Sequence, residues 1–470
     1  MPFITNAVCF FEIVNIFCCP VFSPSLKTLG VLNFAINNNK FSNLKSLLNN
    51  DQKDFLKRYL FPHKVIEEKE RFIEEKADII RTMTLLLADL ELKTKKIGGD
   101  ITTSKTRVEL SNNKIMQKYK LEEGFYAGIS LGVPGSGYID FHKDNLFIIS
   151  SKGVLAYTKS FDDIISFKQI RHNTDDFLGL KQITKDNWFS LKDILIHQDK
   201  IFLSYTEEIK DDCWNTSIIY GDINYENIIF KKLFSPEECV HSKNNIDNEF
   251  NGGQSGGKMI VFDDNHILFT IGDYRNRHLA QNKESVNGKI LKINLTDGNY
   301  ELISIGHRNP QGLFFDKESN LIIETEHGPQ GGDEINLIEV EKIKSNIIVN
   351  YGWPIASAGE HYGGRIESNL KTYEKYPLYK SHKEHGFIEP IKSFVPSIAI
   401  SEITKIQKNK YVLSSLADKS IYFFDLDENK KIINFERVEV FERVRDIRFY
   451  KNKLYLFLEN TASLGIINLN

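Results

Sequence analysis

Three short segments between Gly306 and Pro354 concentrate the residue types that can do chemistry. They are GHRNPQG (306–312), EHGPQGGDEIN (326–336) and NYGWP (350–354). Apolar triplets on both sides of the polar stretch 316–320 predict two strands joined by a tight turn. The flanking segments are then loops at strand ends, where a rigid sheet commonly displays functional residues. Glycine and proline alone indicate only turns. A turn has no need of His307-Arg308-Asn309, so we expect a functional site here.

Six hairpin patterns repeat along the chain and are the elements that must hold these loops. Each has alternating apolar positions, a polar turn and a denser apolar run. The six span Tyr138–Ile149, Asp193–Ser204, Lys258–Thr270, Leu313–Glu324, Ile403–Ser414 and Val444–Leu458. Radially repeated four-stranded sheets account for this pattern. We therefore expect an all-β fold, a six-bladed β-propeller over residues 115–470. The alternative is a large β-sandwich, but roughly 350 residues exceed the usual size of that fold.

The overall composition sets wider limits. The chain has 470 residues, enough for two or three domains or for one large repeat domain. It is 41% hydrophobic and 12% aromatic, which favours a large core built from strands. A net charge of −3 gives no electrostatic reason to expect a nucleic-acid partner.

The first 36 residues form an apolar segment, interrupted at Glu12, that is about long enough to cross a bilayer. We expect a membrane anchor with a periplasmic or other extracytoplasmic domain. The basic n-region of a secretory signal is absent, because Lys27 is the first basic residue. The basic residues that follow would instead hold the C-terminal side in the cytoplasm. A buried or mis-assigned N-terminus is the alternative.

Residues 41–98 are expected to form a helical stalk. Its apolar residues fall mainly at sevenfold spacing, at Ile66, Ile73, Ile80, Leu87 and Leu90. This spacing predicts a coiled-coil-like seam and hence a homodimer through the helix. An amphipathic helix docked on the following domain fits the pattern nearly as well.

Two of the five cysteines, Cys213 and Cys239, lie inside the predicted propeller. They are expected to form a disulfide if the domain is exported to an oxidising compartment.

The three segments together resemble the soluble glucose/sorbosone dehydrogenases that use pyrroloquinoline quinone (PQQ), a family that includes the aldose sugar dehydrogenases. The resemblance covers about Gly124 to Leu469 and implies a six-bladed propeller. It implies that Arg308 and Asn309 bind PQQ and that the backbone carbonyls of Gly328 and Pro329 hold Ca²⁺. Oxygen ligands suit that hard cation.

An Arg-x-Arg-Asp sequence near the C-terminus, Arg443-Val444-Arg445-Asp446, matches residues that face the cofactor in this family. Guanidinium groups are suitable partners for a tricarboxylate quinone, because each offers a planar fork of donors. On composition alone, Arg443 and Arg445 could equally be solvated strand residues.

Two departures from the family pattern stand out. Gln254 occupies the position of the histidine base, and a primary amide cannot accept a hydroxyl proton. Asp273 matches the aspartate that orients that histidine. In addition, Ala417 stands where the family often has a PQQ-contacting lysine. Lys419, two positions along and on the same strand face if the strand continues, is expected to substitute for it.

Two functions from different classes remain open at this point. The first is a PQQ- and Ca²⁺-dependent oxidoreductase acting on an aldose sugar or a related alcohol, with His241, His307 or Asp273 as the base. His307 could equally be a structural histidine. The second is a non-catalytic, membrane-tethered propeller that binds a glycan or a protein partner. The loss of the base favours this second function, whereas the retained arginines oppose it.

Overall fold

The computed structural model describes residues 69–80, 82–83, 86, 100–121, 136–158, 166–186 and 188–469. The chain divides into two compact units, residues 1–81 and 82–470. In the first unit, residues 69–80 are α-helical, and the predicted seam residues Ile73 and Ile80 are each 65% exposed. The other seam positions and the apolar segment 1–36 lie outside the described residues, so dimerisation and anchoring stay predictions. None of the helices that the structure describes is long and apolar enough to span a membrane.

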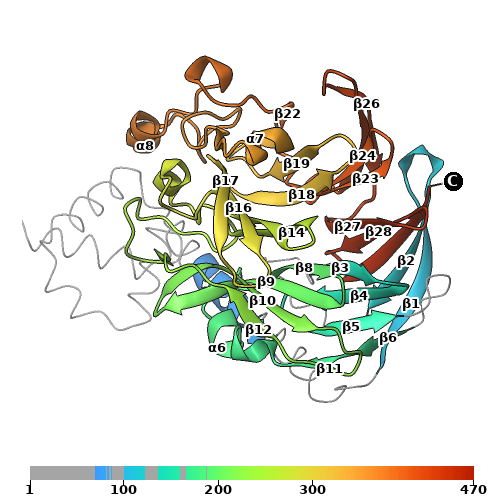
Figure 1. Ribbon diagram of the computed structural model, residues 1–470. Helices are drawn as coiled ribbons and strands as arrows, with labels where there is room; N and C mark the ends of the chain where they lie inside the picture. The colour runs from blue at the N-terminus through green and yellow to red at the C-terminus, as the bar shows by residue number, and fades with distance from the viewer. Residues whose placement is uncertain are drawn as a thin grey trace, which may run out of the picture. The chain divides into compact units, whose positions relative to one another are not determined.

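Mainly antiparallel sheets build the second unit. The largest has nine strands in the order β27-β28-β29-β2-β1-β6-β5-β4-β3. Its strands are β1 (Asp100–Glu109), β2 (Ile115–Leu121), β3 (Gly137–His142), β4 (Asn145–Ser150), β5 (Leu155–Thr158), β6 (Ser166–Gln169), β27 (Val444–Tyr450), β28 (Lys453–Leu458) and β29 (Ser463–Asn468). In Figure 1 the red strands β27 and β28 lie beside the blue strands β1 and β2.

Four further sheets come from the middle of the chain. Their orders are β12-β10-β9-β8, with β13 paired to β10, then β14-β15-β16-β17-β21, β18-β19-β20-β22 and β23-β24-β25-β26. The strands of the first two are β8 (Leu191–His197), β9 (Lys200–Lys210), β10 (Cys213–Asp222), β12 (Lys231–Phe234), β13 (Val240–His241), β14 (Gly256–Asp263), β15 (His266–Ile271), β16 (Lys289–Asn294), β17 (Tyr300–Ile305) and β21 (Val349–Asn350). Those of the last two are β18 (Pro310–Asp316), β19 (Leu321–Glu326), β20 (Asp333–Glu339), β22 (Lys392–Phe394), β23 (Ile400–Gln407), β24 (Lys410–Ser415), β25 (Ser420–Leu426) and β26 (Ile432–Glu439).

The remaining elements are short connections. They are the paired strands β7 (Arg171–His172) and β11 (Asn227–Ile228), the helices α6 (Leu180–Ile183), α7 (Val340–Lys344) and α8 (Leu370–Lys375), and the 3₁₀ turns η1 (Ser111–Asn113), η2 (Thr174–Asp176), η3 (Arg277–Gln281), η4 (Glu367–Asn369) and η5 (Lys383–His385).

All six predicted hairpins are confirmed. They are β3–β4, β8–β9, β14–β15, β18–β19, β23–β24 and β27–β28. Several of their turns contain polar residues with positive φ, such as Lys143 (55°), Asn320 (49°) and Asn409 (59°). Asparagine adopts that conformation more readily than most residues do, which is why the polar triplets located the turns correctly.

The first strands of the six hairpins form a closed series. β3 contacts β8, β8 contacts β14, β14 contacts β18, β18 contacts β23, β23 contacts β27, and β27 contacts β3 again. The chain closes the series by pairing β2 with the last strand, β29. This nearly closed arrangement of antiparallel sheets is consistent with a β-propeller. The sheet structure also starts earlier than the predicted residue 115, because β1 pairs with both β2 and β6.

Buried charges tie these first strands together. Lys258 Nζ lies 2.9 Å from the carboxylate of Asp193, 3.7 Å from that of Asp446, and in contact with Glu402. Arg448 lies 2.6 Å from Asp446. Lys258, Asp193, Glu402 and Asp446 are all nearly inaccessible, and buried charges need such partners. The network joins strands that are distant in sequence, and it also accounts for the lysine four residues after Gln254.

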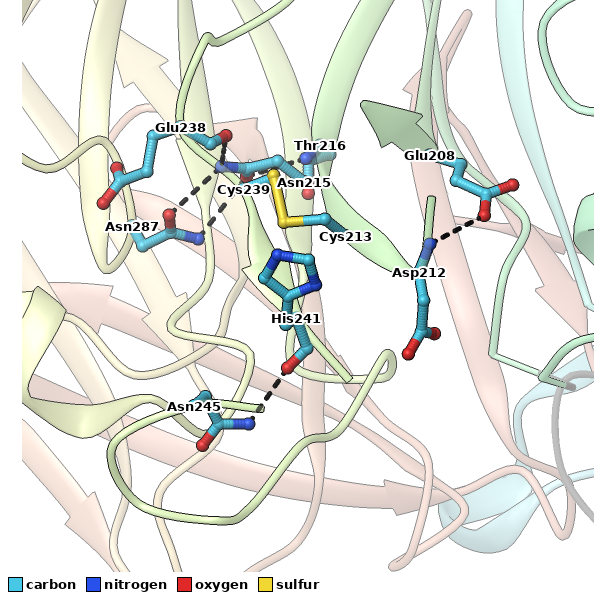
Figure 2. Close-up of a disulfide and its surroundings, with 10 residues drawn as sticks. All are labelled: Glu208, Asp212, Cys213, Asn215, Thr216, Glu238, Cys239, His241, Asn245 and Asn287. Atoms are coloured by element: carbon cyan, nitrogen blue, oxygen red, sulfur yellow. Dashed lines mark hydrogen bonds between the residues drawn. A yellow bond between two sulfur atoms is a disulfide. The ribbon is translucent and has the colours of Figure 1, made fainter. Parts of the chain in front are cut away.

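The predicted pairing of Cys213 with Cys239 is confirmed by a disulfide with a Cα–Cα distance of 5.3 Å. Figure 2 shows it beside His241, in β13. Trp214, the residue after Cys213, stacks on Phe189 with ring centroids 3.5 Å apart. The disulfide therefore anchors a buried aromatic pair close to the loop that carries Gln254.

Candidate active site

One pocket brings together loops from two sheets and from the long insertion between β21 and β22. It is lined by Gln254, Arg275, Arg277, Arg308, Pro329, Trp353, His361 and Tyr362. Gln254 precedes β14, the first two arginines follow β15, Arg308 follows β17 and Pro329 follows β19. The pocket thus lies where the sequence patterns predicted loops, and three of its eight lining residues are arginines.

Gln254 bridges two of the predicted site residues. With its amide oriented by its surroundings, Nε2 donates to Asp273 Oδ1 at 3.0 Å and Oε1 accepts from Arg308 Nη2 at 2.9 Å. Asp273 also accepts from Trp353 Nε1 at 2.8 Å. Burial raises the pKa of Asp273, although the neighbouring Arg308 opposes that shift. Gln254 therefore holds Asp273 and Arg308 in position. The replacement of the family's histidine did not by itself predict this role.

Hydrogen bonds and aromatic contacts fix the position of Arg308. Its Nη1 donates to the carbonyl of His327 at 2.9 Å, and its backbone N–H donates to Glu326 at 2.6 Å. Its guanidinium lies 5.5 Å from the ring centre of Trp353 and 5.9 Å from that of Tyr362. Such contacts fix a guanidinium in one orientation and favour its charge. Arg308 is thus a preorganised cation at the pocket wall.

Arg275 and Arg277 supply the other positive charges. Glu249 pairs with Arg277 Nη1 at 2.5 Å and with Arg275 Nε at 3.2 Å. The Arg275 guanidinium also lies 5.4 Å from the ring centre of Tyr362. One carboxylate shared by two arginines leaves the pair with excess positive charge, which favours an anionic ligand.

A chain of hydrogen bonds connects Asn309 with the C-terminal arginines. Asn309 Oδ1 accepts from Gln311 Nε2 at 3.0 Å, and Gln311 Oε1 accepts from Arg445 Nη1 at 3.2 Å. Glu459 accepts from Arg445 Nε at 2.6 Å and from Arg443 Nε at 2.8 Å. Burial raises the pKa of Glu459, but Arg445 and Arg443 outweigh that effect and hold the pKa below its usual value. The structure therefore joins Asn309, Arg443 and Arg445 in one network.

The Gly328-Pro329 turn is built tightly. A Cβ on Gly328 would lie 2.0 Å from the carbonyl oxygen of Gly332, so no larger residue fits this turn. Asp333 holds the turn by accepting from the Gly328 N–H at 3.1 Å. Among the residues the structure describes, the buried Nε2 of neighbouring His327 has no hydrogen-bond partner. A turn with carbonyl oxygens beside an arginine-lined pocket fits a hard cation with an anionic ligand.

Three predicted residues lie elsewhere. Lys419 is exposed, in the turn between β24 and β25, so the expectation that it shares a strand face with Ala417 is wrong. The strand ends at Ser415, and Lys419 has a φ of 52°. His241 is exposed beside the disulfide. His307 is fully buried between Ser304 (2.8 Å) and Glu326 (3.3 Å), which fits the structural alternative.

Sequence reasoning missed the residues that complete the pocket. They are Arg275, Arg277, Trp353, His361 and Tyr362. Trp353 belongs to the NYGWP segment, and SAGEHYGG (357–364) follows close behind it. The density of glycine, histidine and tyrosine in SAGEHYGG could have marked it as a functional loop. No sequence pattern marks Arg275 and Arg277 as site residues, because only the packing of the loop after β15 brings them to the pocket.

Known proteins are similar to this chain in sequence. Aldose sugar dehydrogenase YliI of Escherichia coli is 25% identical over 317 residues, which cover 61% of this chain and 78% of that protein. Quinoprotein glucose dehydrogenase B of Acinetobacter calcoaceticus is 33% identical over 186 residues, 29% of this chain and 37% of that protein. An uncharacterized Synechocystis protein is 31% identical over 229 residues, and the chain spans about half of its length (51%).

Solved structures share the fold. The apo-form of the E. coli soluble aldose sugar dehydrogenase has a TM-score of 0.55 at 21% identity and covers 70% of this chain and 95% of that one. The PQQ-bound aldose sugar dehydrogenase of Streptomyces coelicolor has a TM-score of 0.52 at 16% identity, with 75% and 98% covered. The family model for glucose/sorbosone dehydrogenases matches residues 164–467. Because that match takes in well over half of the chain, the protein belongs to the glucose/sorbosone dehydrogenase family.

Proposed function

We propose that this protein is a PQQ- and Ca²⁺-dependent oxidoreductase that oxidises an aldose sugar or a related alcohol. The observation that carries the proposal is the pocket of three arginines beside the Gly328-Pro329 turn in a chain of this family. Relatives described as a quinoprotein glucose dehydrogenase and as a PQQ-bound aldose sugar dehydrogenase support the choice of cofactor. We further propose that the second unit is a six-bladed propeller, supported by the closed series of first strands.

In this proposal each group has a distinct task. Arg308 and Asn309 hold the cofactor, and Arg445, with Arg443 behind it, adds positive charge through the Gln311 link. The carbonyls of Gly328 and Pro329 hold Ca²⁺. When bound, the quinone supplies the redox chemistry by accepting a hydride from the substrate carbon. Gln254 fixes the positions of the Arg308 and Asp273 side chains relative to each other through its two hydrogen bonds.

The test is cofactor binding by the purified full chain. PQQ is titrated into the protein with Ca²⁺ and, separately, with EDTA, and binding is followed by calorimetry. We expect saturable binding that requires Ca²⁺ and is weakened by Arg308→Gln, together with dye-coupled oxidation of at least one aldose. Arg365→Gln is the matched control, because Arg365 stacks on Tyr373 (4.3 Å) and is absent from the pocket wall. Absence of PQQ binding with Ca²⁺ would reject the proposal.

The remaining parts of the proposal concern location. We propose an extracytoplasmic domain anchored through residues 1–36, with the helical segment 41–98 as a dimerising stalk. The disulfide between Cys213 and Cys239 supports an oxidising compartment. The alternative of a non-catalytic binding module gains no support from family membership, and a module without a cofactor has little need for this cluster of arginines.

A further inference from the structure

The pocket raises the question of which side chain accepts the substrate proton, since Gln254 cannot. Of the eight lining residues, the three arginines stay protonated, and Trp353 and Pro329 offer no basic atom. The hydroxyl of Tyr362 lies 3.4 Å from Arg308 Nη2 as its acceptor and is a poor base near neutral pH. Asp273, the other candidate, is fully buried and does not line the pocket, so the imidazole of His361 remains.

Hydrogen bonding fixes the tautomer of His361. Its Nε2 lies 2.8 Å from the carbonyl oxygen of Tyr376. A carbonyl oxygen can only accept, so Nε2 carries the proton and Nδ1 carries the lone pair. Tyr373 holds His361 in place. Its ring packs edge-on with the two centroids 4.5 Å apart, and its Oη accepts a hydrogen bond from the backbone N–H of His361 at 3.2 Å. Within the described part of the chain, no donor contacts Nδ1.

The charges around His361 keep it neutral. Burial lowers its pKa, the hydrogen bond to Tyr376 opposes that shift, and the positive charge of Arg277 adds to it. Glu249 and Glu360 act in the opposite direction. Glu249 is engaged with Arg275 and Arg277, and Glu360 with Lys380 at 2.7 Å. A neutral imidazole with a free lone pair is the state that a general base needs.

We propose that His361 is the general base of this protein and that its Nδ1 takes the hydroxyl proton of the substrate. The inference rests on the proposed function and identifies the residue that replaces the family's histidine. In the step, the substrate O–H bond breaks and an N–H bond forms at Nδ1. The C–H electron pair leaves as hydride to the quinone oxidant, and the C–O bond becomes C=O. The imidazolium then returns its proton to water.

His361→Gln tests the role without removing the donor to Tyr376. General-base catalysis is worth about 10²–10⁴-fold, so kcat/KM should fall by that order while PQQ affinity is unchanged. The wild-type rate should rise with pH through the pKa of His361, and this limb should vanish in the variant. His385→Gln is the matched control, because His385 is exposed and stacks on Tyr379.

A second readout needs no cofactor. In ¹⁵N-histidine NMR of the apo-protein, assigned through the His361→Gln variant, the ring should be the Nε2–H tautomer and stay neutral at pH 7. An Nδ1–H tautomer, a protonated ring, or PQQ binding with turnover unchanged in His361→Gln would overturn the inference alone. PQQ binding by a wild type without turnover would reject the oxidation step of the proposed function, and the inference with it, while leaving the cofactor site intact. Absence of PQQ binding in wild type as well as variant would instead reject the proposed function, and the inference with it.

Discussion

Removal of the disulfide between Cys213 and Cys239 should destabilise the second unit by a predictable amount. The cysteines are 26 residues apart in sequence. Closing a loop of that length in the unfolded chain removes about 12 cal/mol/K of entropy, or about 3.5 kcal/mol at 25 °C. The folded state changes little when the bond is broken, because β13 stays paired with β10 through Trp214 and Val240.

The measurement is urea unfolding of the full chain, followed by tryptophan fluorescence. Trp214 is buried against Phe189 and reports on the loop directly. We expect the Cys213→Ala/Cys239→Ala variant to lose about 3 kcal/mol of unfolding free energy, and reduction of the wild type to have the same effect. Adding reductant to the double variant is the control and should change nothing. A loss below about 1 kcal/mol in both experiments would refute the loop-entropy reasoning.

Four further outcomes are expected. In a His361→Gln background, Gln254→His should place a new imidazole beside Asp273 and recover dye-coupled sugar oxidation by up to about 10²–10⁴-fold; no recovery would show that the new histidine is idle. Lys258→Met leaves Arg448 as the one cation paired with the buried carboxylates of Asp193, Glu402 and Asp446 in the described part of the chain, so unfolding free energy should fall by about 3–5 kcal/mol; an unchanged urea midpoint would contradict the role of the charged network. Gly328→Ala should abolish Ca²⁺-dependent PQQ binding while circular dichroism stays native, because the new Cβ meets the Gly332 carbonyl; normal titration curves would argue against a cation at this turn. Deleting residues 51–96 should lower the light-scattering mass from dimer to monomer, whereas a monomeric full chain would reject the dimerising seam.

The sequence predicted the parts of the fold whose signals are local. Hairpins such as Val444–Leu458 were found because apolar alternation and polar turns coincide. β1 was missed because nine of its ten residues are partly or fully exposed, and Ile101 alone is fully buried. The strand is defined by its neighbours β2 and β6 rather than by an apolar pattern of its own.

The site residues likewise fall into those that the local sequence predicted and those that it did not. Arg308 and Asn309 lie in a dense segment and were predicted, whereas Arg277 and His361 meet across loops that are 84 positions apart in sequence. No periodicity carries such information. The error over Lys419 has a specific physical cause, since counting alternate residues requires a continuous strand and β24 stops at Ser415.

The pairing of β2 with β29 has a consequence for synthesis of the chain. Tyr119 faces Leu464, 345 residues later. At 5–20 residues per second, the ribosome needs roughly 20–70 seconds to supply that partner. During this time, the edge of β2 that β29 will cover has unpaired N–H and C=O groups of the kind that promote aggregation. Loss of only the last eight residues, from Ser463 onward, would remove β29 and leave that edge permanently unpaired.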